Sequence, residues 1–229
     1  MTEQSLWYLE NIDVSGIFCP KKLGDESNFG HAHKKIKKGQ NIYVPEDAAD
    51  KIYLINEGRI KIGNYGVGGK EITKAILGKG EIFGELAIVG DSKRRDFALA
   101  MEETSLCIMP RDEMKSLMKD HSGLNLFMMK IMGKRTLEME KRLESLVFKD
   151  SRSRIIEFLL DLVDKKGQRV GYEMLVRKFI THQEVANMTA TSRQTVTTVL
   201  NELRSKNLIT FDRKRLLIRD IEQLKTELA

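Results

Sequence analysis

The chain has 229 residues, of which 41% are hydrophobic and 31% charged, a balance that allows a real core in one large or two modest domains. The N-terminal residues lack a basic segment followed by an apolar run, and no later stretch is long and apolar enough to cross a bilayer. We therefore expect a cytoplasmic protein without membrane contacts. Cys19 and Cys107 are far apart and have no CxxC spacing, so neither a disulfide framework nor a metal site is expected.

The net charge of +6 is concentrated in the last third of the chain. Residues 151–229 contain 15 Lys and Arg against 10 Asp and Glu. This excess favours an anionic partner for that part of the chain, although a basic solvated surface would explain the charge alone more simply.

The first hundred residues change from helical to strand-like periodicity. Apolar residues at helical spacing predict a short amphipathic helix between Leu6 and Phe18. From Lys34 to Pro110, short apolar runs alternate with glycines, a pattern typical of a small antiparallel barrel with a pocket for at most one small ligand. Hairpin turns are predicted at residues 56–58 and 68–69. The expected strands are residues 35–37, 42–44, 52–55, 59–63, 72–77 and 105–109.

Two helices are predicted next, a short one from Arg111 to about Lys119 and a long one from Ser122 to Phe148. Apolar residues of the long helix recur at the a and d positions of a heptad, as in a two-stranded coiled coil. The neighbouring g and e positions carry opposite charges that could pair across a parallel dimer. The alternative is a helix buried within a single domain. Fewer than three heptads are too few to distinguish such a helix from a coiled coil. The predicted dimer contacts are Met129, Met132, Arg135, Thr136, Met139, Glu140, Leu143 and Leu146.

Two further helices are predicted around a turn at residues 189–191, after a helix over residues 152–163. Thr181 and Glu184 form a capping box for the first helix, and Ser192 begins the second. The apolar positions would face inward, which leaves the polar residues at the start of the second helix outward. This arrangement predicts a helix-turn-helix, in which the first turns of the second helix read base edges. A plain helical hairpin is the alternative.

The outward residues suit base recognition. An Arg can bond guanine O6 and N7, a Gln can bond adenine N6 and N7, and a Thr methyl can contact the thymine methyl. Two short strands, residues 208–211 and 216–218, then flank a basic tip and predict a wing that contacts phosphates. The expected DNA contacts are Thr181, Ser192, Arg193, Gln194, Thr197, Thr198, Arg213 and Lys214.

A glycine-rich roll, a long helix and a winged helix in this order resemble the cyclic-AMP receptor protein and fumarate–nitrate regulator (CRP/FNR) family of transcription regulators. The resemblance spans essentially the whole chain and is carried by residues 78–87 (GKGEIFGELA), 146–155 (LVFKDSRSRI), 180–186 (ITHQEVA) and 192–196 (SRQTV).

This resemblance implies an α+β fold in three parts. These are an N-terminal cyclic-nucleotide-binding-type β-roll sensor over residues 1–121, a dimerisation helix over 122–149 and a winged helix-turn-helix DNA-binding domain over 150–229. The implied function is that of a homodimeric transcription regulator, not an enzyme, which binds a palindromic site in double-stranded DNA and contacts RNA polymerase.

In cyclic-nucleotide-binding members of this family, a Gly-Glu-Leu turn and an arginine about ten residues later hold the ribose and phosphate. The resemblance assigns the candidate effector-binding role to Gly84, Glu85, Leu86, Ala87 and Arg95. A salt bridge between Glu85 and Arg95 in an inherited but unused pocket is the alternative.

Several residues depart from the family pattern. Asp96 replaces a hydroxyl residue, and its charge would repel a phosphodiester by about 1 to 4 kcal/mol at 4 Å. Met139 and Glu140 stand where cyclic-AMP receptors place hydroxyl groups against adenine. Gln194 and Thr198 replace Glu and Arg, so the DNA half-site should differ. The effector is therefore not expected to be cyclic AMP. No metal is expected, and neither an iron–sulfur cluster nor haem is supported by the cysteines or histidines.

Two other classes of function compete with this interpretation. A cyclic-nucleotide-type regulatory module could act through protein partners, although the winged-helix sequence argues against it. A small-barrel enzyme of the cupin kind would use His31 and His33 as metal ligands, but the required Glu and distal His are missing.

Overall fold

The computed structural model describes residues 32–90, 92–212 and 214–228. The chain divides into two compact units, residues 1–136 and 137–229. The helix predicted between Leu6 and Phe18, together with Cys19 and His31, lies outside the described residues.

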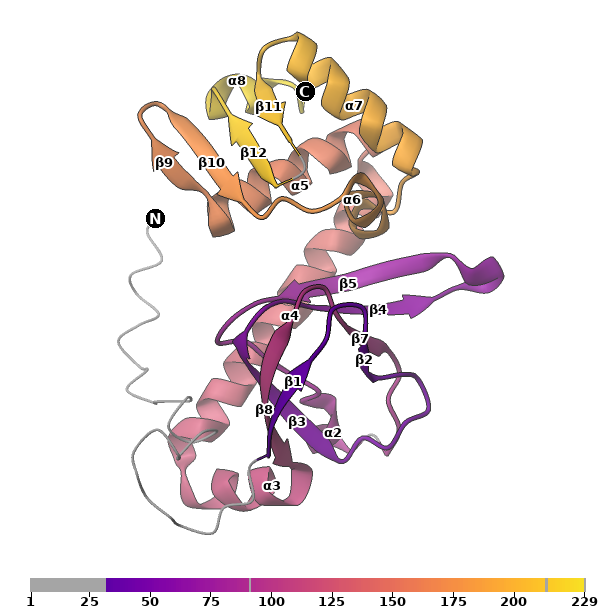
Figure 1. Cartoon of the computed structure of the whole chain (residues 1–229), viewed down its shortest axis with the longest axis vertical. Helices are drawn as coiled ribbons and strands as arrows, with labels where there is room; N and C mark the ends of the chain where they lie inside the picture. The colour runs from indigo at the N-terminus through magenta and orange to yellow at the C-terminus, as the bar shows by residue number, and fades with distance from the viewer. Residues whose placement is uncertain (1–31, 91, 213, 229) are drawn as a thin grey trace. The chain divides into compact units, whose positions relative to one another are not determined.

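The first unit is a β-roll made of two four-stranded antiparallel sheets (Figure 1). One sheet has the strand order β1-β8-β3-β6 and the other β2-β7-β4-β5. Its elements are β1 (Ala32–Ile36), β2 (Asn41–Tyr43), β3 (Lys51–Glu57), β4 (Ile60–Tyr65), η4 (Val67–Gly69), β5 (Glu71–Leu77), β6 (Ile82–Phe83), α2 (Leu86–Val89), β7 (Phe97–Ala100), β8 (Thr104–Pro110) and α3 (Arg111–Asp120).

Strand β3 is apolar on both faces because both faces are covered. Tyr53 and Ile55 belong to the core between the two sheets. Ile52 and Leu54 pack on the opposite face with apolar residues of α3 and of the long helix α4 (Ser122–Phe148). A strand buried on both sides reads as a continuous apolar run, as this one does in the sequence.

One of the two predicted hairpins is wrong. Strands β3 and β4, which flank residues 56–58, belong to different sheets, so the chain crosses between sheets there. The other prediction is confirmed, since Gly68 and Gly69 lie between the paired strands β4 and β5 and have φ of 73° and 75°. Figure 1 shows this hairpin projecting as a long ribbon.

Helix α4 has the predicted bounds, Ser122–Phe148. Leu124 and Met128 are buried in the core beneath β3. Further along, Met129, Met139 and Leu143 are 67%, 73% and 63% exposed. Among the helices that the structure describes, none combines the length and apolar character needed to span a bilayer.

The second unit packs helices against the sheet β11-β12-β10-β9. Strands β9 and β10 and helix α8 were not predicted, because two of these elements are only three and six residues long. Its elements after the end of α4 are α5 (Ser151–Lys166), β9 (Gln168–Val170), β10 (Glu173–Arg177), α6 (His182–Thr189), α7 (Arg193–Ser205), β11 (Ile209–Phe211), β12 (Arg215–Ile218) and α8 (Ile221–Thr226).

Candidate effector pocket and nucleic-acid interface

The pocket in the roll begins at Gly84, between β6 and α2. Gly84 has φ of 79°, and its carbonyl accepts a hydrogen bond from Arg94 Nη1 at 3.1 Å. A Cβ atom here would lie 3.0 Å from that nitrogen and 3.1 Å from the Lys51 carbonyl oxygen. Both the backbone conformation and the crowding therefore require glycine.

Arg94 is a buried cation at the back of this pocket. It is 4% exposed, and its guanidinium donates to the carbonyl oxygens of Gly84 and Lys51. The guanidinium carbon lies 4.4 Å from the centre of the Tyr43 ring and 5.7 Å from that of Tyr53, within range of cation–π attraction. Its Nε is buried and meets no acceptor among the described residues. Burial also raises the pKa of the Tyr43 phenol, which keeps that ring neutral.

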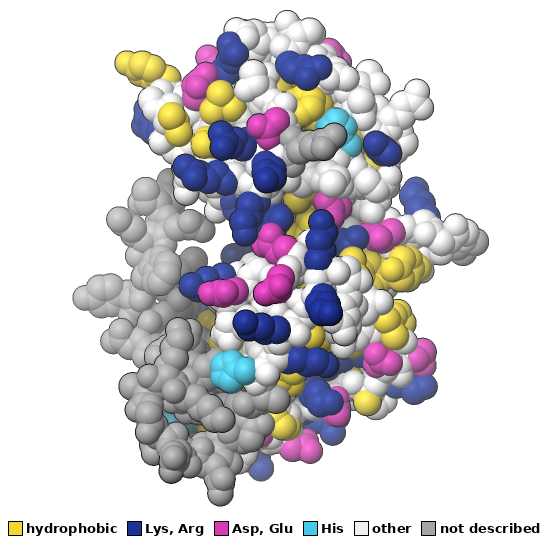
Figure 2. Space-filling view, viewed as in Figure 1, with side chains coloured by type: hydrophobic (Ala, Val, Ile, Leu, Met, Phe, Trp, Pro, Cys, Tyr) yellow, Lys and Arg dark blue, Asp and Glu magenta, His cyan; other side chains and the backbone are white. Residues whose placement is uncertain are grey.

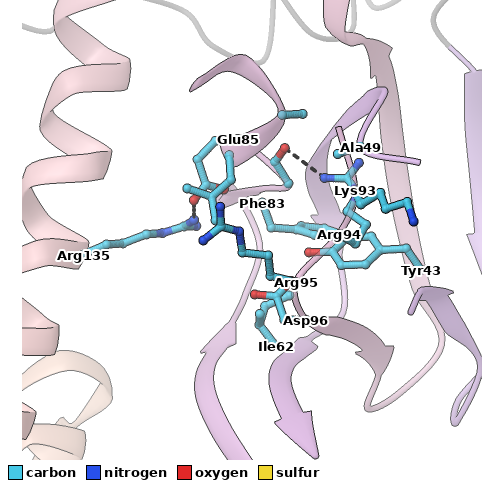
Figure 3. Close-up of a pocket in the computed structure, with 13 residues that line it drawn as sticks. Tyr43, Ala49, Ile62, Phe83, Glu85, Lys93, Arg94, Arg95, Asp96 and Arg135 are labelled. Carbon is cyan, nitrogen blue, oxygen red and sulfur yellow. Dashed lines mark hydrogen bonds and ion pairs between the residues drawn. The ribbon is translucent and has the colours of Figure 1, made fainter. Parts of the chain in front are cut away.

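Glu85 is held by the long helix. Its side chain is 5% exposed, and Arg135 of α4 donates to its carboxylate. Arg135 also donates to the Ile82 carbonyl oxygen at 2.5 Å. Figure 3 shows Arg135 reaching from α4 to Glu85. The heptad register predicts that Arg135 can pair with Glu140 of a second chain, and a salt bridge between Glu85 and Arg95 is the alternative to effector binding. In the structure, Arg135 and Glu85 engage each other within one chain.

The other predicted effector residues, Leu86, Ala87 and Arg95, also line this pocket. Arg95 is exposed, unlike its buried neighbour Arg94. Asp96 accepts a hydrogen bond from Lys74 Nζ at 3.1 Å, so a cation offsets the charge that was expected to repel a phosphate. The cavity measures about 40 Å³, far below the roughly 300 Å³ or more of pockets that hold small-molecule ligands.

Sequence reasoning missed Arg94. It lies beside Arg95, and counting residues from Gly84 does not show which of two adjacent arginines is buried. Burial separates them, and no periodic signal in the sequence around residues 93–96 reports that burial.

The second unit holds the predicted helix-turn-helix, α6–turn–α7. Glu184 N donates to Thr181 Oγ1 at 3.2 Å, and Thr181 N donates to the Glu184 carboxylate at 3.0 Å, which confirms the capping box. Ser192 caps α7 by accepting from Thr195 N at 3.0 Å. The apolar residues expected to face inward are Val185, Ala186, Met188, Val196, Val199, Leu200 and Leu203. All of them are buried except Met188, which is partly exposed.

The start of α7 presents polar side chains to solvent. Arg193, Gln194 and Thr198 are exposed. Thr197 is partly covered, since its hydroxyl contacts His182 Nδ1 at 2.9 Å and donates to the Arg193 carbonyl oxygen at 2.9 Å. A hydroxyl has one hydrogen, so Nδ1 of His182 must carry the proton of the first bond. Burial, and then the charge of Arg193, lower the pKa of the His182 imidazole.

The predicted wing is the pair of antiparallel strands β11 and β12. Lys214 at its tip is exposed, and its backbone N–H donates to Asp212 Oδ1 at 2.6 Å. Arg213 lies outside the described residues. Figure 2 shows many Lys and Arg side chains on the visible face of this unit. The exposed cations on and beside its sheet include Arg169, Arg177, Lys178, Lys214, Arg215 and Arg219.

The described residues contain no group of three or more His, Cys, Asp or Glu side chains that could hold a metal ion. His33 lies in β1, opposite Cys107 of β8, and its predicted partner His31 is outside the described residues.

Each of the two units matches a known protein family. Residues 33–121 match the cyclic nucleotide-binding domain family, and residues 153–227 match the Crp-like helix-turn-helix domain family. The cyclic AMP receptor protein of Thermus thermophilus is 30% identical over 75% of this chain and 76% of its own length. The global nitrogen regulator of a Synechocystis strain is 29% identical over 79% of this chain and 81% of its own length.

Solved structures agree with this assignment. A CooA mutant from Carboxydothermus hydrogenoformans is 25% identical and superposes with a TM-score of 0.78, covering 98% of this chain and 95% of that chain. The molecule is therefore a transcription regulator with a cyclic-nucleotide-binding-type sensor and a helix-turn-helix domain. The chain belongs to the CRP/FNR family.

Proposed function

We propose that this regulator acts as a homodimer that binds a palindromic site in double-stranded DNA. The observation that carries the dimer is the apolar row on α4, because Met129, Met139 and Leu143 are each more than 60% exposed in one chain. Surface residues of this kind, repeated at heptad spacing, are those that a second copy of the helix covers. The dimer contacts would be the eight heptad residues predicted from the sequence, with Arg135 serving the sensor pocket as well.

Each protomer would insert the start of α7 into the major groove. Exposed Arg193 would bond guanine, Gln194 would bond adenine, and Thr198 would contact the neighbouring base pair. Ser192 and Thr181 would contribute through helix ends that they cap, and Lys214 and Arg213 would contact phosphates from the wing. Two-fold symmetry of the dimer would place the half-sites about one helical turn apart. In this role the regulator would contact RNA polymerase in the cytoplasm.

The sensor pocket favours an anionic effector other than cyclic AMP. Arg94 and Arg95 face the pocket, while Lys74 offsets Asp96 and Arg135 offsets Glu85. The cavity of about 40 Å³ has no room for a nucleotide unless side chains move. Related proteins include both cyclic-AMP-activated regulators and global nitrogen regulators, so kinship alone does not assign the effector.

Selection of bound sequences from random DNA, with and without cyclic nucleotides, tests the proposal. We expect enrichment of a palindrome whose half-site contains a guanine that depends on Arg193. Failure to enrich any palindrome under any of these conditions would contradict it. Enrichment that requires cyclic AMP would contradict the proposed effector class and leave the DNA-binding role in place.

A further inference from the structure

The carboxyl end of α6, the first helix of the helix-turn-helix, is capped by two arginines from other helices. Arg142 of α4 donates through Nη2 to the carbonyl oxygens of Asn187 and Met188, at 3.3 and 2.6 Å. Arg154 of α5 donates to the carbonyl oxygens of Thr189 and Ala190, at 3.0 and 3.4 Å. Four successive carbonyl groups at the end of α6 thus receive guanidinium donors.

These bonds are well suited to hold α6 in place. The last four carbonyls of a helix have no partner within it and form the negative end of the helix dipole. A guanidinium both neutralises that end and donates in a fixed, planar geometry. Arg142 is partly buried, and burial lowers its pKa, so its charge lies in a setting that screens it less than water does.

The two arginines tie α6 to different parts of the chain. Arg154 also donates to the Lys149 carbonyl oxygen at 2.8 Å, so it joins α6 to the beginning of its own helix α5. Arg142 instead belongs to α4, two helical turns after Arg135. Its bonds join α6 directly to the long helix that carries the proposed dimer contacts, without passing through α5.

We propose that Arg142 is a positioning residue that fixes the helix-turn-helix on α4 and thereby sets the separation of the two recognition helices. This inference rests on the proposed dimer and palindromic site. Arg142 touches no DNA in this account. It acts on DNA selection through α6, the turn at Ala190 and α7, which are linked by the bonds of Thr191 N and Ala190 N to the Ala186 carbonyl oxygen.

Lys141 provides a matched control. It is the neighbouring cation on α4 and bonds Asp161 of α5 at 2.9 Å, in an exposed pair that contributes little to stability. Lys141→Ala therefore removes one positive charge from α4, with its contacts to Asp161 and, at 4.0 Å, to Glu157 of α5, without touching α6. Arg142→Lys keeps the charge but replaces the planar fork with a single ammonium, which cannot reproduce the same geometry.

The experiment measures affinity of the full-length protein for palindromes that share the selected half-site and differ only in spacer length. Wild type and Lys141→Ala should prefer one spacer. In Arg142→Ala the preference over spacers one base pair longer or shorter should fall by about tenfold or more, because both bonds of Arg142 to α6 are charge-assisted and each corresponds to at least that factor. The spacer preference of Arg142→Lys should lie between those of wild type and Arg142→Ala. A variant that merely folds less well lowers every affinity alike and leaves this ratio unchanged.

Unchanged spacer preference in Arg142→Ala, with wild type selective, would overturn the inference. If Arg142→Ala does not fold, the same comparison with Arg142→Lys decides, and an unchanged preference there overturns it equally. A wild-type protein that prefers no palindrome would instead contradict the proposed function, so the two failures are distinguishable.

Discussion

Arg135 of the long helix holds the carboxylate of Glu85 in the β-roll within a single chain. A ligand that uses Glu85 must therefore displace or share Arg135, which links occupancy of the pocket to the helix that carries the proposed dimer contacts. A coupling of this kind needs only that the ligand favours one of two arrangements of the helix.

Removing Arg135 should destabilise the roll. Arg135→Met leaves the buried Glu85 carboxylate without its cation, at a cost of about 1–3 kcal/mol in the free energy of unfolding. Glu85→Gln combined with Arg135→Met should cost less than the sum of the two single changes, because the pair acts together. Urea unfolding followed by circular dichroism measures all four proteins. Additive losses would show that the two side chains do not interact.

Breaking the apolar row of α4 should separate the protomers without unfolding them. Leu143 is 63% exposed in one chain, so Leu143→Asp should change the stability of a protomer by no more than about 0.5 kcal/mol. In a dimer it would place two carboxylates in an apolar seam. Sedimentation analysis should find wild-type dimers and variant monomers. Dimers of unchanged stability in the variant would exclude this face as the interface.

His182 should titrate below the ordinary histidine range. Burial lowers its pKa first and Arg193 second, so Arg193→Ala should raise the pKa part of the way toward about 6.5. NMR titration of the imidazole measures both values and also reports the tautomer, which the bond to Thr197 predicts to be protonated at Nδ1. His182→Gln assigns the signal. A His182 pKa that Arg193→Ala leaves unchanged would show that the two groups do not interact.

The sign of the pH dependence follows from the same shift. Because the folded pKa lies below the unfolded value of about 6.5, the unfolded chain binds more protons between those two pH values. The contribution of His182 to stability is therefore fully present above pH 6.5 and decreases as the pH falls toward the folded pKa.

Two basic residues should affect DNA binding in different ways. Arg193→Ala should weaken binding to the selected palindrome by about 1–3 kcal/mol. It should also relax the preference for the base identity at one base pair. Lys214→Ala should weaken binding to all sequences alike and reduce the salt slope by about one. Affinities for specific and scrambled DNA over a salt series separate the two. If both variants lost affinity for specific and scrambled DNA to the same extent and with the same salt slope, the roles assigned to Arg193 and Lys214 would be contradicted.

The turn of the helix-turn-helix carries removable strain. Ala190 has φ of 51° and ψ of 46°, a left-handed conformation that costs a residue with a Cβ roughly 1–2 kcal/mol. Glycine avoids that cost but loses about 0.5–1 kcal/mol in chain entropy. Ala190→Gly should therefore stabilise the protein by up to about 1.5 kcal/mol, seen as a higher midpoint of unfolding. A lower midpoint would contradict this account of the turn.

The sequence predicted correctly those features that depend on residues close together in the chain. The capping box at Thr181 and the cap at Ser192 both follow from side chains within a few residues of where they act. Short strands such as β6, with two residues, carry no such signal because their partners lie far away in the sequence.

The contacts that define the pocket and its links could not be predicted for the same reason. Glu85 and Arg135 are 50 residues apart, and Arg142 and Asn187 are 45 apart. A heptad register assigned Arg135 to a partner chain because periodicity reports which face of a helix a residue occupies. It does not report which surface covers that face.

The mass of the complex with a selected palindrome tests the central claim most directly. Sedimentation of the wild-type protein with a short duplex bearing the palindrome should show two protomers on each duplex, with much weaker binding when one half-site is scrambled. One protomer per duplex, or equal affinity for the intact and the half-scrambled site, would contradict a dimer that reads DNA through paired recognition helices.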